Sequence, residues 1–230
     1  ATNANGLSLL NDLVGERNPA DVDAVSDLNT LADAVNRLLV VAAGGTASPA
    51  LTAAELNSLL GINTVTPENL ASVLEAISAS TDDGSGISSL SSARSVIATG
   101  ITTYGAALDA ISTYADTNTG TAPDLATYTT AGVIGLTLSN GSTNTVLLDA
   151  INTSLASIAI TGALVDTTAE VQAIVDAYTA ILAEANGNAA DTNGTDPSAA
   201  NYQAVGVTLG AIATNANGLS LLNDLVGERN

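Results

Sequence analysis

The sequence predicts an all-α protein, organised as a tandem array of small three-helix units. Three observations predict this class. Apolar residues recur at helical spacing along most of the chain, helix-start and helix-stop signals flank these stretches, and the first eighteen residues recur unchanged further along. The hydrophobic share is 46% of 230 residues, but Phe, Trp, Met and Cys are absent. The core must therefore be built from Ala, Leu, Val and Ile.

The clearest repeat is residues 1–18, which recur as residues 213–230, an offset of 212 residues. An identity of this length does not arise by chance, and it is typical of tandem-repeat proteins. A duplicated cloning segment is the alternative. The repeat is favoured because the segment carries a helix pattern that fits both of its flanks.

A weaker repeat lies inside this period. Three segments each combine a proline, a helix that stops at a glycine, an apolar connector and a second helix, and their prolines (Pro49, Pro123 and Pro197) are 74 residues apart. We therefore expect three sub-repeats of about 70 residues in each 212-residue period. The expected divisions are the end of a preceding sub-repeat in 1–48, whole sub-repeats in 49–122 and 123–196, and the start of the next in 197–230.

The first helix of each unit carries explicit signals. Thr52 and Glu55 form a capping box, and Asp196 reads as an N-cap ahead of Pro197. Each helix is expected to stop at a glycine in the left-handed conformation: Gly61, Gly132 and Gly206. Tyrosines four residues earlier, Tyr128 and Tyr202, are expected to pack against the neighbouring unit. The connector that follows is too short for a helix and could pair as a stub of strand.

The second helix is expected to start at Thr66 and Pro67, and its apolar stripe has helical spacing: Leu70, Val73, Leu74 and Ile77. The third helix is the longest. Its three versions are expected to begin at Asn18 and Pro19, at Leu90, and at Thr167, which forms a capping box with Glu170.

The composition excludes several classes of chemistry. Without His, Cys and Lys there is no Ser-His-Asp triad, thiolate nucleophile, imidazole or thiolate zinc site, P-loop lysine or Schiff base. A net charge of −19 with four basic residues opposes nucleic-acid binding. No stretch reaches the roughly 20 apolar residues that span a bilayer. We expect no catalytic residue, no small-molecule substrate and no membrane insertion. A carboxylate-pair enzyme would need a cleft that this composition can hardly line.

One loop has the oxygen-rich side chains that Ca²⁺ requires, and its candidate ligands are Asp191, Asn193, Thr195 and Asp196. The Gly and Glu positions of an EF-hand are absent, and an ordinary turn ahead of a helix is the alternative. Residues 82–86 form a second acidic, glycine-containing loop of the same kind. No cofactor other than Ca²⁺ is expected.

The long identical copies, the acidic charge, the absence of Cys and the segment VDTTAEVQAIVDAY (165–178) together resemble the helical repeat regions of giant bacterial surface proteins, the RTX-like and Bap-like adhesins and biofilm-matrix proteins. The resemblance implies an extracellular, cell-surface protein whose repeats supply length to a stalk or fibre. Neighbouring copies of the repeat are then the expected partners. The alternatives are an ordered filament, sheath or surface layer, and a helical module that binds a host protein.

Overall fold

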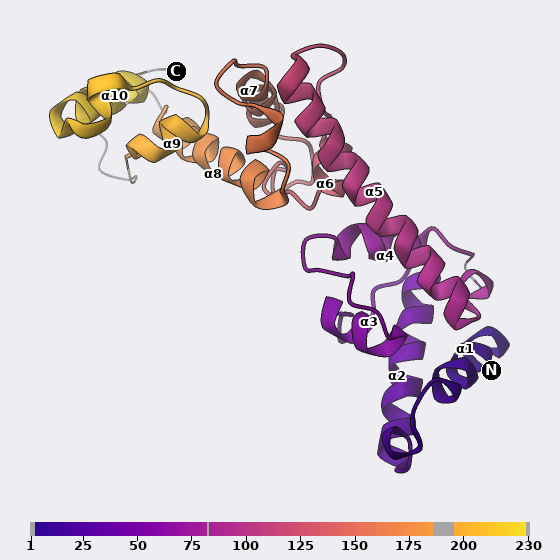
Figure 1. The fold of residues 1–230 in the computed structure, drawn as a ribbon. Helices are drawn as coiled ribbons and strands as arrows, with labels where there is room; N and C mark the ends of the chain where they lie inside the picture. The colour runs from indigo at the N-terminus through magenta and orange to yellow at the C-terminus, as the bar shows by residue number, and fades with distance from the viewer. Residues whose placement is uncertain (1–2, 82, 186–195, 229–230) are drawn as a thin grey trace. The chain divides into compact units, whose positions relative to one another are not determined.

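The computed structural model describes residues 3–81, 83–185 and 196–228 (Figure 1). In these residues the protein is all-α, with ten α-helices, and the only strand pairing is an isolated antiparallel bridge between Thr137 and Thr143. The predicted fold class is confirmed at this level. The connectors form loops and a 3-10 turn, and the expected strand stub is reduced to this one bridge.

The chain divides into two compact units, Ala1–Ala106 and Ala107–Asn230. Unit 1 contains α1 (Ala4–Gly15), α2 (Val25–Ala42), α3 (Ala53–Leu60), α4 (Leu70–Ser78) and the first part of α5 (Leu90–Thr117). Unit 2 contains the rest of α5, α6 (Leu125–Thr130), α7 (Thr145–Leu155), α8 (Thr168–Glu184), α9 (Ala199–Ala204) and α10 (Ala216–Gly227). Four 3-10 segments complete the order: η1 (Pro19–Asp21), η2 (Ser85–Ile87), η3 (Gly162–Leu164) and η4 (Gly210–Thr214).

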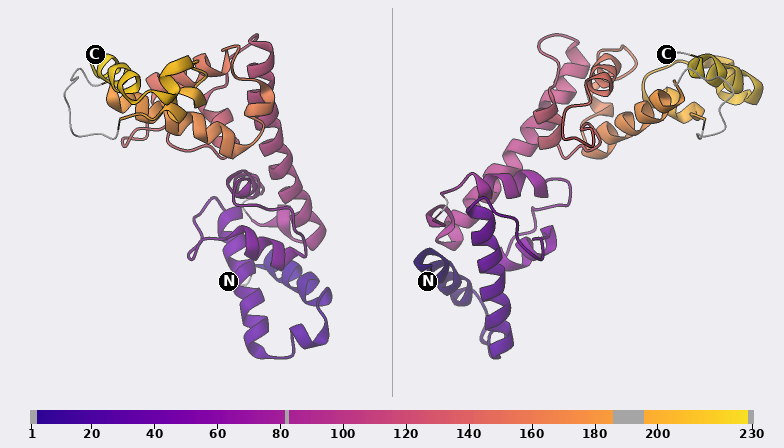
Figure 2. Two further views of the ribbon diagram at one scale, coloured as in Figure 1. Left: turned by 60° about the vertical axis from the view of Figure 1, so that its left-hand side comes forward. Right: turned by 180° about the vertical axis from the view of Figure 1, so that it is seen from behind.

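The core of unit 1 is aliphatic, as the composition requires. In this unit α1 packs on α2 and on η2, and α2 also packs on α3 and α4, which Figure 2 shows from two further directions. The largest fully buried side chains come from all five helices and from η2: Leu9, Leu13, Leu38, Leu56, Leu60, Ile77, Ile87 and Ile97. In unit 2 the long helix α8 plays the central part, since α7, α9 and α10 all pack on it.

Several start and stop signals read from the sequence are confirmed. The Thr52 hydroxyl accepts a hydrogen bond from the Glu55 amide (3.2 Å), and the Thr167 hydroxyl accepts one from the Glu170 amide (3.3 Å). The glycines at which the short helices stop have positive φ: Gly61 (62°), Gly132 (77°) and Gly206 (88°). A side chain is strained in this conformation, which explains why glycine stands at each stop.

Three predicted helix starts are wrong. Asp196 does not cap α9; Ser198 does, because its hydroxyl accepts from the Asn201 amide (3.3 Å). Asn18 and Pro19 begin only the short η1 turn, and α2 starts six residues later at Val25, where the Asp27 carboxylate accepts from the Ala24 amide (3.2 Å). At α9 a hydroxyl nearer the helix satisfies a free amide of the first turn, whereas at α2 no side chain does so and the Asp27 carboxylate binds the amide of the residue that precedes the helix.

The third wrong start is that of α4. Thr66 and Asn69 do pair, since the Asn69 side-chain oxygen accepts from the Thr66 amide (2.9 Å) and the Thr66 hydroxyl accepts from the Asn69 amide (3.3 Å). This pairing closes a turn around Pro67, and the helix begins after it, at Leu70. The stripe of Leu70, Val73, Leu74 and Ile77 lies on α4 as expected, with Val73 and Ile77 fully buried.

Three of the four arginines lie in the described residues, and each binds α3. Arg17 donates to the carbonyl oxygens of Ser58 (2.8 Å) and Leu59 (3.1 Å), and Arg94 donates to that of Leu60 (2.8 Å). Carbonyls in the last turn of a helix have no partner within the helix, and cations are favoured there. A helix of eight residues is thus held at its C-terminus by two guanidinium groups.

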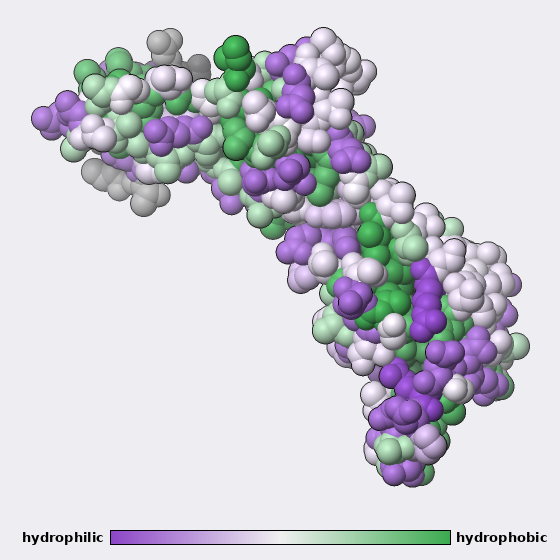
Figure 3. All heavy atoms as spheres, in the orientation of Figure 1, coloured by the Kyte–Doolittle hydropathy of each residue, from purple (hydrophilic) through white to green (hydrophobic). Residues whose placement is uncertain are grey.

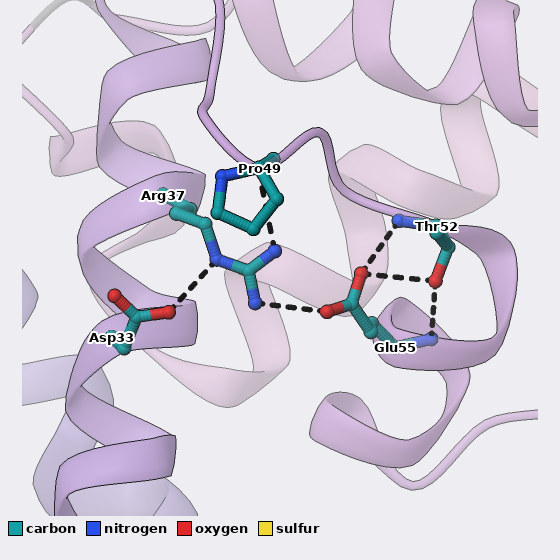
Figure 4. A network of polar contacts seen from close by, with 5 residues as sticks. All are labelled: Asp33, Arg37, Pro49, Thr52 and Glu55. Atoms are coloured by element: carbon teal, nitrogen blue, oxygen red, sulfur yellow. Dashed lines mark hydrogen bonds and ion pairs between the residues drawn. The ribbon is translucent and has the colours of Figure 1, made fainter.

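Arg37 holds the other end of α3 (Figure 4). Its guanidinium binds Glu55 (3.0 Å) and the exposed Asp33 (3.0 Å), and the second oxygen of Glu55 accepts from the Thr52 amide (2.9 Å). The hydrogen bond from Arg37, and then those from Thr52, lower the pKa of Glu55 below its ordinary value. The capping box read from the sequence is therefore also the point at which α2 is tied to α3.

Candidate functional site

Most of the predicted calcium loop lies outside the described residues. Asp191, Asn193 and Thr195 fall in the gap between 185 and 196, and Asp196, at its edge, is exposed. Within the described ranges no three acidic side chains come together as a metal-binding group. Calcium at this loop therefore stays a prediction.

The second acidic loop, residues 82–86, has a packing role. Asp82 lies outside the described residues. The Asp83 carboxylate accepts from the Ser85 amide (2.8 Å), which lowers the pKa of Asp83, and the Asp83 carbonyl oxygen accepts from the side chain of Asn5 (2.9 Å). The loop is thereby fastened to the first turn of α1.

The described part of the repeated segment forms the same helix at both of its positions. Helix α1 runs Ala4–Gly15 and helix α10 runs Ala216–Gly227. The two helices have the same sequence, and they begin and end at equivalent residues of the repeated segment. Each begins after an asparagine whose side chain caps it: Asn3 accepts from the Gly6 amide (3.1 Å), and Asn215 accepts from the Gly218 amide (3.1 Å). The segment's own sequence is therefore enough to form and cap this helix. The residues that pack around the helix differ between the two positions.

In unit 1 this helix buries its leucine face. Leu9 and Leu13 are 0% and 1% exposed and belong to the core with α2. Gly6 lies so close to α2 that a Cβ there would stand 2.5 Å from a methyl carbon of Leu39. The Asp12 carboxylate accepts from the Leu90 amide at the start of α5 (3.0 Å).

In unit 2 the same helix buries a different face. Asn223 is 3% exposed; its side-chain oxygen accepts from the Tyr202 hydroxyl (2.7 Å), and its amide nitrogen donates to the Pro197 carbonyl oxygen (3.2 Å). Hydrophobic residues reach the surface of both units (green in Figure 3). In α10 they include Leu221 and Leu225, 59% and 51% exposed, which correspond to the fully buried Leu9 and Leu13.

The contact of Tyr202 with Asn223 and Pro197 has a counterpart in the same unit. The Tyr128 hydroxyl donates to the Asn152 side-chain oxygen (2.7 Å), and Asn152 donates to the Pro123 carbonyl oxygen (3.0 Å). We call these two arrangements the Pro-Tyr-Asn clamps. Each joins a short helix to the next helix along the chain. The hydrogen bonds of each clamp close within one predicted sub-repeat, but α9, which carries Tyr202, also packs on α8 of the preceding predicted sub-repeat. The expectation that Tyr128 and Tyr202 pack against a neighbouring unit therefore stays a prediction.

The sequence reasoning missed the asparagines of these clamps. Asn152 and Asn223 each stand within an apolar helical stretch, where an amide is costly unless its hydrogen bonds are made. An asparagine in such a stretch, with a tyrosine 21 or 24 residues earlier, was the sequence signal that could have predicted each clamp.

Replacing Tyr128 by Phe is expected to lower the free energy of unfolding by about 0.5–1.5 kcal/mol, because the hydrogen bond between the fully buried Tyr128 and the partly exposed Asn152 is lost. Tyr202→Phe should cause a similar loss, since its clamp is built in the same way. Urea unfolding followed by circular dichroism measures both. An unchanged midpoint in both variants would contradict the clamps.

Stability is expected to fall at alkaline pH. Burial raises the pKa of Tyr128, and burial, with the nearby carboxylates of Glu184 and Asp196, raises that of Tyr202 from 10.0 to about 12. The unfolded phenols ionise first, so the contribution to stability is complete below about pH 10 and is lost as the pH rises toward 12. Urea midpoints across this range measure the loss, and Tyr202→Phe should show a shallower decline. An equal slope in both proteins would contradict the assignment.

In comparisons of this chain with protein-family models, with curated proteins and with solved structures, nothing matched. Among the helices of the described residues, none combines the length and the hydropathy that crossing a membrane requires.

Proposed function

We propose that the chain is a non-enzymatic structural repeat of a giant secreted bacterial surface protein, and that its copies give length and self-association to an extracellular fibre or adhesin stalk. The observation that carries this proposal is the return of residues 1–18 as 213–230, with the same helix at each place. Copies this similar are typical of arrays in which each unit packs on its neighbours.

The order of the helices supports the three sub-repeats. In the predicted sub-repeats a short, a medium and a long helix follow one another, as α3-α4-α5 and α6-α7-α8; α9-α10 begin the next sub-repeat and α1-α2 end the preceding one. Their lengths are 8, 9 and 28 residues, then 6, 11 and 17, then 6 and 12, with 12 and 18 for α1 and α2. A 3-10 segment precedes each long helix. Helix α1, with the sequence of α10, is then the medium helix of the preceding sub-repeat.

The composition supports an exposed location. Cys, Met and Trp, the side chains most open to oxidation, are absent, and four arginines without lysine leave few sites for trypsin-like proteases. A net charge of −19 keeps a concentrated polymer from collapsing on itself and suits saline surroundings.

Negative-stain electron microscopy of the native material, with and without a chelator, tests the proposal. Thin strings are expected for a stalk, and regular filaments or sheets with an axial period for the alternative of an ordered assembly. Loss of order only in the chelator would support calcium at Asp191–Asp196. Compact single particles at every concentration, with turnover of a substrate, would overturn the proposal.

A further inference from the structure

The repeated helix has two faces, and each of its two positions buries only one of them. Successive residues of an α-helix are about 100° apart, so positions two residues apart lie on nearly opposite sides. Asn11 and Gly15 therefore lie opposite Leu9 and Leu13. In α1 the leucines are buried and Asn11 and Gly15 are exposed; in α10 the corresponding leucines are exposed, and Asn223 and Gly227 are buried.

The exposed face of α1 borders an open space. A hollow of about 520 Å³ lies beside it, lined by Asn11 and Gly15 from this face and by Leu90, Ser91 and Arg94 from α5. The corresponding face of α10 is covered by the segment that carries Pro197 and Tyr202. The same asparagine is thus clamped at one position and faces a hollow at the other.

Helix α7 has both faces covered at once. Its Asn152 lies in a Pro-Tyr-Asn clamp with the preceding short helix. Ser154, two residues further on, is 2% exposed, and its hydroxyl donates to the Val205 carbonyl oxygen (3.0 Å). Leu225 follows Asn223 by two residues, as Ser154 follows Asn152, but Leu225 is half-exposed. Helix α7 therefore shows that a helix of this kind can be covered by other segments on two faces at once.

We infer that α10 is a helix shared by two successive periods, serving also as the first helix of the next copy. This inference rests on the proposed function and names the surface that joins the copies. The Asn223 face stays on Pro197 and Tyr202. The face of Leu221 and Leu225 packs on α2 and on residues 83–90 of the next copy, as α1 packs on these segments in unit 1.

The contacts of α1 specify what the next copy supplies. Gly218 allows the close approach that Gly6 makes to Leu39, Asp224 accepts from the amide of Leu90 in the next copy, and Asn217 donates to the carbonyl oxygen of Asp83 in the next copy. These partners follow from sequence identity, because every residue of α1 recurs in α10. The occupant of the leucine face is therefore a second copy of this chain.

Thiol labelling tests the shared helix, since the chain has no cysteine and one introduced thiol is the only one present. Leu221→Cys is made in the 230-residue chain and in a two-period chain, in which residue 230 continues directly as residue 19 of a second copy. The thiol at 221 is expected to react about 100-fold more slowly in the two-period chain, because burial restricts reaction to local opening. Leu225→Cys repeats the test one turn further along.

Ser220→Cys is the matched control. Ser8 in α1 and Ser220 in α10 are both exposed, so this thiol should react at the same rate in both chains. Equal rates for Leu221→Cys in the two chains would overturn the inference, and so would slow reaction of all three thiols, which would indicate general burial. Filaments combined with an unprotected Leu221→Cys would overturn the shared helix and leave the proposed function standing. A protected Leu221→Cys thiol in particles that never associate into fibres would support the shared helix and overturn the proposed function.

Discussion

Leu13→Ala is expected to lower the free energy of unfolding by about 2–5 kcal/mol, whereas Leu225→Ala should change it by less than about 0.5 kcal/mol. Both substitutions alter the same position of the same twelve-residue helix sequence. The difference arises because Leu13 is 1% exposed in the core of unit 1, where its loss leaves a cavity, and Leu225 is 51% exposed.

Urea unfolding of the full chain, followed by circular dichroism at low protein concentration, measures the two losses. Low concentration matters because association of copies would bury Leu225 and raise its cost. Leu9→Ala and Leu221→Ala form a second matched pair, with exposures of 0% and 59%. Equal losses within each pair would show that the two helices do not have the surroundings described.

Two glycines of α5 are expected to respond to the same substitution with opposite signs. A Cβ at Gly100 would lie 2.6 Å from the Val73 Cα and 2.7 Å from the Ser72 carbonyl oxygen. These are backbone atoms of α4, so the helices must move apart, and Gly100→Ala should cost about 1–3 kcal/mol or more. At Gly105 a Cβ would meet nothing within 4 Å, and Gly105→Ala should stabilise the helix by about 0.5–1 kcal/mol.

Thermal unfolding of the two variants against the parent chain measures this contrast. Gly100→Ala should lower the melting temperature and Gly105→Ala should raise it. The Gly105 variant is the control for helix propensity, since both changes replace glycine by alanine inside one helix. A rise in both variants would mean that α4 and α5 are not in contact at Gly100.

Much of the local structure could be predicted from the sequence because its causes are local. The capping boxes of Thr52 with Glu55 and of Thr167 with Glu170 need only residues three apart, and the glycine stops need only a conformation that side chains disfavour. The starts of α2 and α9 could not be read in this way. At α9 Ser198 rather than Asp196 reaches a free amide, and at α2 no side chain caps the first turn, so both starts depend on the path of the backbone.

The repeated helix, α1 and α10, also has features that the sequence predicts and features that it does not. The sequence alone determined that Ala4–Gly15 and Ala216–Gly227 form one helix twice, with the same asparagine cap, because helix formation and capping depend on neighbours along the chain. Only the tertiary structure decided that Leu9 is buried where Leu221 is exposed, and that Asn223 is clamped by Tyr202 where Asn11 faces a hollow. Identical sequences cannot encode that difference, since burial depends on which segments pack against the helix.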